Sequence, residues 1–148
     1  MWPNSVQIKM SEAPADLPAP RSAPDAGPYW QAAAEDRLVM QHCYGCGTYR
    51  FFPSHLCPEC GSDEQVWGPC SGRGTIYSLT TVHRAPSQVF RKAVPYIVAL
   101  IDLEEGPRMM ANIVGEGRDR ASIGDAVEVC FEPRGSGAKV PQFKLTGA

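Results

Sequence analysis

The sequence predicts a mainly β protein, with a short N-terminal helix, a cysteine-rich ribbon and then a small five-stranded barrel. Two C-x-x-C pairs separated by ten residues predict the ribbon. Five segments rich in β-branched and aromatic residues follow in the second half of the chain, with no long helical pattern between them, and they predict a closed or nearly closed barrel. The length of 148 residues suits one compact domain or two very small ones in contact.

The overall composition excludes several classes of protein. Hydrophobic residues make up 43% of the chain and charged residues 20%, which are ordinary values for a globular domain. No stretch approaches the roughly 20 consecutive apolar residues that span a bilayer, and Met1–Met10 lacks the apolar run of a secretory signal. We therefore expect a cytoplasmic protein with no membrane partner. The net charge of −2 argues against a nucleic-acid partner, because phosphate contacts need clustered Lys and Arg.

The N-terminal region is expected to hold a flexible tail and a short helix. In the tail, residues 1–27, Pro and Ala dominate from Ser11 onward, and so few large apolar side chains cannot offset the entropy cost of ordering. Pro28 suits the first turn of a helix, and good helix formers follow it. Residues 28–41 are therefore predicted as this helix and a lead-in strand. Within the helix, Trp30 is either a packing residue against the ribbon or an anchor for another protein chain.

The ribbon, residues 42–70, is predicted to bind one structural zinc ion. Two thiolates two residues apart can point at the same ion, and the glycine after each pair, Gly47 or Gly61, permits a turn with positive φ. Because a site of four protein thiolates is coordinatively closed, the zinc is expected to hold the fold together and not to activate water. The predicted ligands are Cys43, Cys46, Cys57 and Cys60.

Three other uses of these four cysteines have to be weighed on chemical grounds. A redox C-x-x-C pair usually occurs singly, at the start of a helix in a βαβ unit. Two disulfides are disfavoured in a reducing compartment. A rubredoxin-like iron site needs the same four thiolates, so iron stays an alternative to zinc. The remaining cysteines, Cys70 and Cys130, have no basic partner nearby in the sequence and are expected to be inert.

Residues 71–148 are predicted to form the barrel. The second strand is a continuous apolar run and is expected to be buried on both faces, whereas the fourth alternates between inward apolar and outward acidic residues. A Glu-Glu-Gly-Pro turn separates the second strand from the third. The five predicted strands are Thr75–Val82, Tyr96–Asp102, Arg108–Val114, Ala126–Glu132 and Gln142–Leu145.

A basic stretch crosses the first part of this barrel. No Asp or Glu occurs from Ser71 to Ile101. In a five-stranded barrel of the oligonucleotide/oligosaccharide-binding (OB) kind, the first connection, here His83–Val94, often helps to form the binding face. A positive field there would suit a phosphorylated ligand or an acidic patch on a partner, although an ordinary solvated loop is the alternative. The candidate residues are Arg73, Arg84, Arg91 and Lys92.

No motif of a known catalytic site occurs in the chain. His42, His55 and His83 do not sit in a pattern typical of a nucleophile with its base or of a metalloprotease helix. The Gly72-Arg-Gly74 segment is too short for a phosphate-cradling loop and is expected to mark the entry to the barrel. The sequence therefore predicts no catalytic residues and no activity of the chain alone.

Several motifs in a fixed order give the chain a family resemblance. A short aromatic helix leads into paired cysteine knuckles, followed by Cys57-Pro-Glu-Cys60-Gly-Ser, Ser71-Gly-Arg-Gly-Thr-Ile-Tyr77, Pro95-Tyr-Ile-Val98 and Ile123-Gly-Asp-Ala-Val127. In these features, over roughly Gly27 to Pro133, the chain resembles the acyl-CoA-associated OB-fold proteins with an N-terminal rubredoxin-like zinc ribbon.

The resemblance implies a function that the residues alone do not. Members of that family assemble with thiolase-superfamily enzymes, including thiolases, acyltransferases and the retro-aldolases of steroid side-chain degradation; others associate with hotdog-fold enoyl-CoA hydratases. The partner carries the catalytic residues, and the ribbon–OB subunit contacts it and can line the channel for the CoA thioester. We therefore expect a non-catalytic accessory subunit, with Trp30 and the four basic residues as candidates for contact with CoA or the partner.

The alternative function from the residues is a single-stranded nucleic-acid binder, because OB-folds and zinc ribbons both serve that role. Such a protein needs a basic groove with stacking aromatic residues. Tyr77, Phe90 and Tyr96 lie near the basic stretch in the sequence. The negative net charge weighs against this function.

Overall fold

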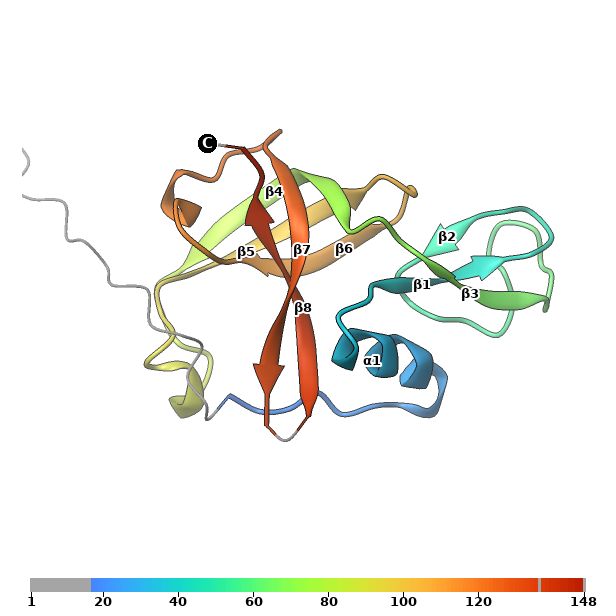
Figure 1. Cartoon of the computed structure of the whole chain (residues 1–148), viewed down its shortest axis with the longest axis horizontal. Helices are drawn as coiled ribbons and strands as arrows, with labels where there is room; N and C mark the ends of the chain where they lie inside the picture. The colour runs from blue at the N-terminus through green and yellow to red at the C-terminus, as the bar shows by residue number, and fades with distance from the viewer. Residues whose placement is uncertain (1–16, 136, 148) are drawn as a thin grey trace, which may run out of the picture.

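A helix, a three-stranded ribbon and a five-stranded barrel follow one another in the computed structural model of the chain, which describes residues 17–135 and 137–147 (Figure 1). This architecture confirms the predicted fold class. Most of the predicted tail, residues 1–16, lies outside the described residues. Within the described ranges, no helix is long and apolar enough to cross a membrane.

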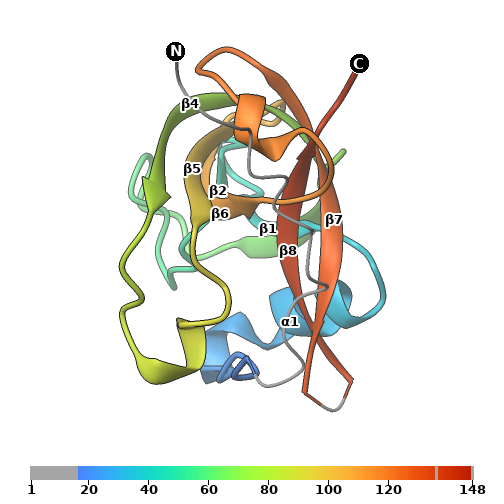
Figure 2. The ribbon, with the colours of Figure 1, turned by 90° about the vertical axis from the view of Figure 1, so that its left-hand side faces the viewer.

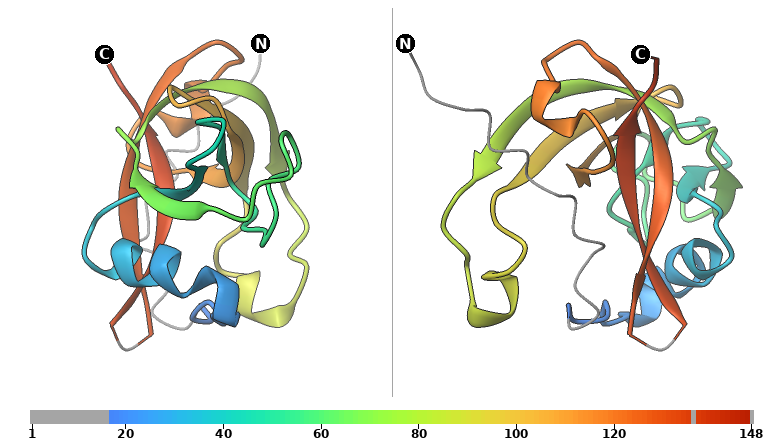
Figure 3. Two further views of the ribbon diagram at one scale, coloured as in Figure 1. Left: turned by 90° about the vertical axis from the view of Figure 1, so that its right-hand side faces the viewer. Right: turned by 60° about the vertical axis from the view of Figure 1, so that its left-hand side comes forward.

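The helix α1, Gly27–Ala34, follows a single 3-10 turn at Pro24–Ala26, and Pro28 lies in its first turn. This placement agrees with the fixed φ of proline and its missing N–H, which suit a helix start. The small side chains of Ala32 and Ala33 are buried, and they let α1 lie close to the β1 strand of the ribbon and the β8 strand of the barrel. Figure 3 shows α1 beside these two strands.

The ribbon is a small antiparallel sheet with the strand order β2-β1-β3. Its strands are β1, Val39–Cys43, β2, Tyr49–Arg50, and β3, Gln65–Pro69. The side chain of Arg50 joins the three strands, since its Nε donates to Gln41 Oε1 at 2.9 Å and its second terminal nitrogen donates to Gln65. This polar connection stands in for a hydrophobic core in a sheet too small to build one.

The barrel closes in the order β4-β5-β6-β8-β7. Neighbouring strands are antiparallel except for β6 and β8, which meet in parallel where Ile113 lies opposite Phe143 and so close the sheet. Each strand overlaps one of the five predicted segments. The strands are β4, Arg73–Val82, β5, Tyr96–Leu103, β6, Arg108–Ile113, β7, Ala126–Arg134, and β8, Ala138–Leu145.

The structure corrects the expectation that the second barrel strand is buried on both faces. Residues of β5 alternate strictly between buried and half-buried. The inner row, which includes Ile97 and Ile101, packs in the core, and the outer row of Tyr96, Val98 and Leu100 stays partly exposed. Two of these apolar outer residues, Tyr96 and Val98, line a groove that is described below, and the last outer position is the charged Asp102.

The ribbon and the barrel share one hydrophobic core. Leu38 and Met40, from the start of the ribbon, belong to the same buried cluster as Ile76 and Phe143 of the barrel. The N–H of Cys70 also donates to the carbonyl oxygen of Leu38 at 2.9 Å, just before the chain enters β4. Figure 2 shows the barrel strands with α1 beneath them and the ribbon behind. The two parts are therefore one packing unit.

Candidate metal centre and apolar groove

Two matching knuckles position the four cysteines of the ribbon. In the first, the N–H of Gly47 donates to the carbonyl oxygen of Cys43 at 2.9 Å; in the second, the N–H of Gly61 donates to that of Cys57 at 2.8 Å. The two glycines have φ values of 79° and 76°, a left-handed conformation that other residues adopt only at a cost. The predicted role of the glycines is confirmed, and both knuckles point their sulfurs to one place.

The four sulfur atoms fit a single tetrahedral ion. The Sγ atoms of Cys43, Cys46, Cys57 and Cys60 all lie within 4.8 Å of one another. Two of the separations, between Cys43 and Cys60 and between Cys46 and Cys57, are 3.6 Å. Sulfurs at about 2.3 Å from a zinc ion form a tetrahedron with edges of about 3.8 Å. The cysteines are therefore positioned to bind one metal ion.

Backbone N–H groups near the sulfurs favour the thiolate form that a metal requires. The pKa of Cys57 is lowered to about 6, chiefly by the N–H of Cys60, and the pKa of Cys43 is lowered chiefly by the N–H of Cys46. Opposing effects act on Cys60. The N–H of Ser62, the largest single effect, lowers its pKa, but the neighbouring thiols, Cys43 first, and burial together outweigh it and raise the pKa to about 12. Four thiolates thus repel one another unless a cation lies between them.

The positions of the sulfurs bear on one alternative use of the cysteines. All six cysteines are free thiols, and the Cys43–Cys60 and Cys46–Cys57 sulfurs are 3.6 Å apart, well beyond the roughly 2.05 Å of a disulfide bond. Burial raises the pKa of Cys70 to about 12, with a further contribution from the negative charge of Glu105. Burial also raises the pKa of Cys130. Both thiols are therefore protonated at neutral pH, which agrees with the prediction that they are inert.

A second candidate site is an apolar groove of about 650 Å³ on the outer face of β5 and β6. This volume lies within the range of small-molecule sites, about 300–1,000 Å³. Besides the outer rows of these strands, its walls come from α1, the connection between β4 and β5, and the β7–β8 hairpin. On one wall Met110 is 62% exposed, which is high for so apolar a side chain. Five aromatic residues line the groove: Tyr29, Trp30, Phe51, Phe90 and Tyr96.

The polar groups of the apolar groove are mostly basic. Lys92, Arg118 and Arg134 line it, with Glu132 as the acidic residue. Arg134 and Glu132 form an ion pair of 2.6 Å and are only 11% and 17% exposed. The neighbouring Gln142 is buried, and its Oε1 accepts a hydrogen bond of 2.7 Å from the backbone N–H of Asn112. The groove therefore combines apolar walls with a net positive rim.

The structure brings only two of the five predicted contact residues together in this groove. Trp30 and Lys92 both line it, whereas Arg84 and Arg91 are exposed on the same connection as Lys92. The expected packing of Trp30 against the ribbon is made instead by its neighbour Tyr29, whose ring lies 6.2 Å from that of Phe51. The ring of Trp30 instead packs edge-to-face on the ring of Tyr29, with 4.9 Å between the ring centroids.

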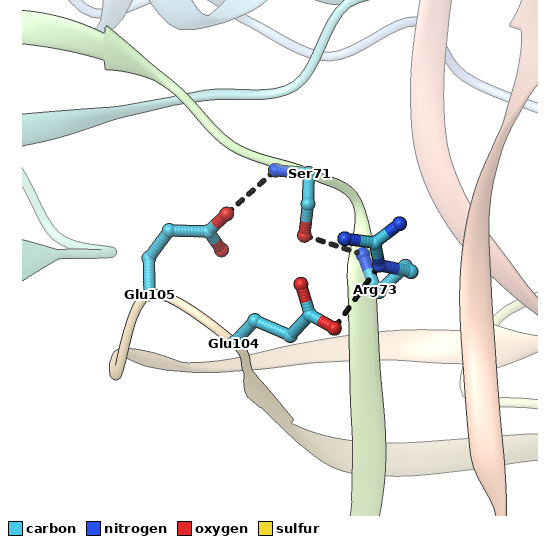
Figure 4. A network of polar contacts seen from close by, with 4 residues as sticks. All are labelled: Ser71, Arg73, Glu104 and Glu105. Carbon is cyan, nitrogen blue, oxygen red and sulfur yellow. Dashed lines mark hydrogen bonds and ion pairs between the residues drawn. The ribbon is translucent and has the colours of Figure 1, made fainter.

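Arg73 lies at the opposite end of β4 and belongs to a different network. Its Nε donates to Glu104 Oε1 at 3.0 Å, and the N–H of Ser71 donates to Glu105 Oε1 at 2.6 Å. Figure 4 shows these contacts between the entry of the barrel and the turn after β5. No Asp or Glu occurs in residues 71–101, but the fold brings Glu104 beside Arg73. Arg73 is therefore placed as a structural residue at the junction.

Most of the groove was not predictable from the sequence. The residues that line it come from segments far apart in the sequence, from Leu17 to Gln142. One signal was present: the apolar outer row of β5, which an exposed strand face would not have. The aromatic α1 was a second signal, since it supplies both Tyr29 and Trp30.

Two family models match the chain in succession. The first, described as the ChsH2 rubredoxin-like zinc ribbon domain, matches residues 30–65. The second, described as the ChsH2 C-terminal OB-fold domain, matches residues 67–132. The two matches meet at the start of β3, the last strand of the ribbon, shortly before the chain enters the barrel.

Similar proteins include subunits of enzymes and scaffold proteins. The chain is 38% identical over 107 residues to the "Probable enoyl-CoA hydratase alpha subunit" of Thermomonospora curvata, which covers 72% of this chain but only 33% of that protein. The chain thus spans about a third of the length of that relative. It is also 41% identical over 98 residues to a "DUF35 domain-containing scaffold protein" of Methanothermobacter thermautotrophicus, covering 64% of this chain and 71% of the relative.

A solved structure shares the complete architecture. The chain superposes with a TM-score of 0.77 and 34% identity on a chain of a structure described as "Ltp2-ChsH2(DUF35) aldolase". The superposition covers 86% of this chain and 99% of the other. The match therefore includes the ribbon, the helix and the barrel together.

Proposed function

The chain belongs to the ChsH2 family, in which a rubredoxin-like zinc ribbon precedes an OB-fold domain, and we propose that it is a non-catalytic accessory subunit of an acyl-CoA enzyme. Its catalytic partner would be a thiolase-superfamily subunit, such as a thiolase, an acyltransferase or a retro-aldolase. The observation that carries this proposal is the match over almost the whole of a chain from a structure described as an aldolase with two named components.

The chemistry of the described residues supports a role without catalysis. The group of His, Cys, Asp and Glu side chains placed to hold a metal ion is the closed set of four thiols, which leaves no open position for a substrate or water. The two remaining thiols have raised pKa values and are poor nucleophiles at neutral pH. These features of the described residues support a role in binding rather than in catalysis.

The four cysteines would hold zinc as a structural ion. Bound there, zinc would supply no reaction chemistry, because its four positions would be filled by protein sulfurs. Cys43 and Cys46 would be joined through the ion to Cys57 and Cys60, so that two knuckles distant in the sequence become one unit. Since Leu38 and Met40 continue this unit into the barrel core, the ion would stabilise the barrel as well.

The apolar groove is the place where this subunit would help to bind the thioester. Its apolar walls suit the acyl and pantetheine parts, and Trp30 offers a large rigid surface. Lys92 on the rim, with the exposed Arg84 and Arg91 of the same connection, would face the phosphates of CoA. Arg73 is left out of this proposal, because it lies near the far end of β4 and is paired with Glu104.

A thiolase-fold subunit is the first choice of partner and a hotdog-fold hydratase the second. The relative from Thermomonospora curvata, named a hydratase alpha subunit, is about three times as long as the part that this chain matches. Such a protein has room for a further domain beside the ribbon and barrel. The likeness to a chain of a structure described as an aldolase, over 99% of that chain's length, supports the thiolase-superfamily partner.

Co-purification of the tagged full chain from its own cell extract, with zinc analysis of the same sample, tests the proposal. We expect recovery of a thiolase-superfamily protein together with about one zinc ion per chain. The purified pair should turn over an acyl-CoA substrate, and the isolated chain should not. Recovery of the chain alone, or an isolated partner that is fully active and stable without it, would contradict the proposal.

The same preparation tests the alternative of a single-stranded nucleic-acid binder. One observation favours that alternative, since the rings of Phe90 and Tyr96 lie 6.2 Å apart in a groove that also holds Lys92. Salt-sensitive binding of an oligonucleotide to the pure chain would support it. We expect no such binding, because Glu132 in the groove and the net charge of −2 oppose phosphate backbones.

A further inference from the structure

The apolar groove follows the edge of β6 as well as its outer face. Residues 110–114, from β6 and the position after it, all line the groove, although the side chains of a strand point alternately to opposite faces. Ala111 and Ile113 are 7% and 1% exposed and belong to the hydrophobic core. The wall at these two positions therefore includes the backbone edge of the strand. Residues 140–142 of β8 line the groove in the same unbroken way, so the groove lies between two strand edges.

Pro141 explains why β6 and β8 pair at a single point. The strands meet in parallel at Ile113 and Phe143, where the N–H of Val114 donates to the carbonyl oxygen of Phe143 at 2.8 Å. Toward the start of both strands, the next bonds of a parallel ladder would include one from the N–H of residue 141 to the carbonyl oxygen of Met110. Proline has no N–H to donate. The two edges therefore separate, and the β7–β8 hairpin runs on past the barrel beside α1 (Figure 3).

This separation leaves the edge of β6 at Met110 without a neighbouring strand. The N–H of Asn112 points away from β5, since it donates to the side-chain oxygen of Gln142 on β8 at 2.7 Å. Because the direction of these groups repeats every second residue in an antiparallel pair, the N–H and C=O of Met110 point the same way. Among residues 17–135 and 137–147, β6 pairs on that side only at Ile113. A side chain thus replaces the missing strand at Asn112, and Met110 has no such replacement.

The walls of the groove select a single extended chain as the occupant of this edge. α1 and the β7–β8 hairpin line the groove beside it, so the edge of a second barrel could not approach. One row of side chains from an extended chain would meet the apolar wall, which includes Trp30 and Phe90. The opposite row would face Lys92 and the exposed Arg84 and Arg91 of the same connection. The complementary chain therefore alternates between apolar and acidic residues.

We propose that an extended segment of the catalytic subunit adds as a strand to β6 in this groove. Its backbone would form hydrogen bonds with the N–H and C=O of Met110, which is how peptides add to the free edge of a sheet. The identity of the partner rests on the function proposed above, whereas the free edge does not depend on it. The outer face of β5, with Tyr96 and Val98, would remain available to the thioester.

Hydrogen exchange resolved to single amides tests this contact in the unmodified protein. The full, zinc-loaded chain is compared with its purified pair with the catalytic subunit. We expect exchange at the N–H of Met110 to be fast in the free chain and to slow by about a hundredfold or more in the pair. Met109 and Ala111 are internal controls, because their N–H groups face β5, and they should be protected in both samples.

Each other result of this comparison has a definite meaning. Equal exchange of Met110 in the free chain and the pair would overturn the strand addition and leave the proposed accessory function intact. Equal protection of Met110 by CoA added to the free chain would also overturn it, because the amides of the ligand would then be the occupant. So would protection of the free chain that rises with its own concentration, since a second copy would then fill the groove.

A pair of substitutions isolates the backbone group from the side chain of Met110. Met110→Pro removes the N–H, at an edge position where proline is tolerated, and Met110→Ala removes only the side chain. We expect the affinity for the catalytic subunit to be about tenfold lower in Met110→Pro than in Met110→Ala. Urea denaturation and zinc content of both free variants show whether they fold. Equal affinities of two folded variants would contradict the proposal, and the exchange measurement decides if Met110→Pro does not fold.

A synthetic octapeptide of alternating valine and glutamate tests the edge without the partner. We expect it to shift the amide resonance of Met110 in the free chain in a saturable way, and its fully N-methylated counterpart, which has no backbone N–H, to give no such shift. If co-purification recovers no catalytic subunit, the proposed function fails and this probe alone decides on the edge. Absence of binding in that case, or equal effects of the two peptides, would overturn the inference.

Discussion

Gly74 and Asp102 face each other so closely, at the entry to the barrel, that no side chain fits between them. A Cβ added to Gly74 would lie 2.6 Å from the backbone carbonyl oxygen of Asp102 and 2.8 Å from the Cγ2 of Ile101. The contact joins β4 to the end of β5, where Gly74 lies opposite Leu103. This explains the second glycine of the Ser71-Gly-Arg-Gly motif: it sets the distance between two barrel strands.

Substitution at this point should therefore loosen the barrel. We expect Gly74→Ala to lower the free energy of unfolding by about 1–3 kcal/mol, because a backbone atom cannot move aside as a side chain can. Urea denaturation followed by circular dichroism measures the change. Gly27→Ala is the matched control, since a Cβ at Gly27 meets nothing within 4 Å, and it should leave stability unchanged or slightly improved. Equal effects of the two substitutions would show that the close contact is not what requires glycine.

Loss of one metal ligand should unfold the ribbon. In Cys57→Ser the remaining thiolates cannot complete the tetrahedron, and we expect zinc content to fall from about one ion per chain to a small fraction of that. Cys70→Ser removes a thiol outside the site and should leave the zinc content unchanged. Metal analysis after gel filtration gives both numbers. A full zinc content in Cys57→Ser would exclude this residue as a ligand.

The half-buried thiol of Cys70 should make stability depend on pH above neutrality. Its pKa is raised to about 12 in the folded chain, by burial first and Glu105 second, above the ordinary value of about 8.5 in an unfolded chain. The preference for the neutral thiol is therefore fully present below about pH 8.5 and is lost as the pH rises toward 12. We expect the stability advantage of the wild type over Cys70→Ala to shrink between pH 8 and pH 11. A constant difference, measured by urea denaturation, would contradict the raised pKa.

The basic connection between β4 and β5 should affect binding of CoA to the assembled enzyme. Arg91→Ala combined with Lys92→Ala removes two positive charges beside the groove, and we expect the dissociation constant of CoA to rise about tenfold. Arg73→Ala is the control: it also removes a basic residue, but at the far end of β4, where Arg73 is already paired with Glu104. Isothermal titration of the purified complex compares the three proteins. A similar loss in the control would show a general effect of charge and not a local contact.

The metal centre was predictable from sequence because its geometry is local. Each C-x-x-C pair and its following glycine form one tight turn, so spacing alone specifies where the sulfurs point. The strands were predictable for a related reason: β-branched and aromatic runs separated by turn residues determine each strand with little help from the rest of the fold. Strand burial was less predictable, as β5 shows. An apolar outer row such as Tyr96 and Val98 reads the same whether another layer or a groove lies over it.

The groove and its charges depend on contacts between distant residues. Arg73 and Glu104 are separated by 31 positions in the sequence, so the acid-free stretch gave no warning of their ion pair. Leu17 stands alone as a large apolar residue in a Pro-rich segment, and only the fold shows that it is buried. In both cases the contacting residues come from a distant segment of the chain, and no repeating pattern in the sequence predicts such a contact.

Leu38 and Met40 tie the ribbon into the core of the barrel, and this limits how the family can be recombined. Protein engineers often exchange a metal-binding module between homologues as if it were a separate cassette. Here the cassette would carry two of the hydrophobic residues around which the acceptor barrel is packed. A chimera made at the junction before β4 should therefore express poorly unless the facing barrel residues, such as Ile76 and Phe143, are transplanted with it.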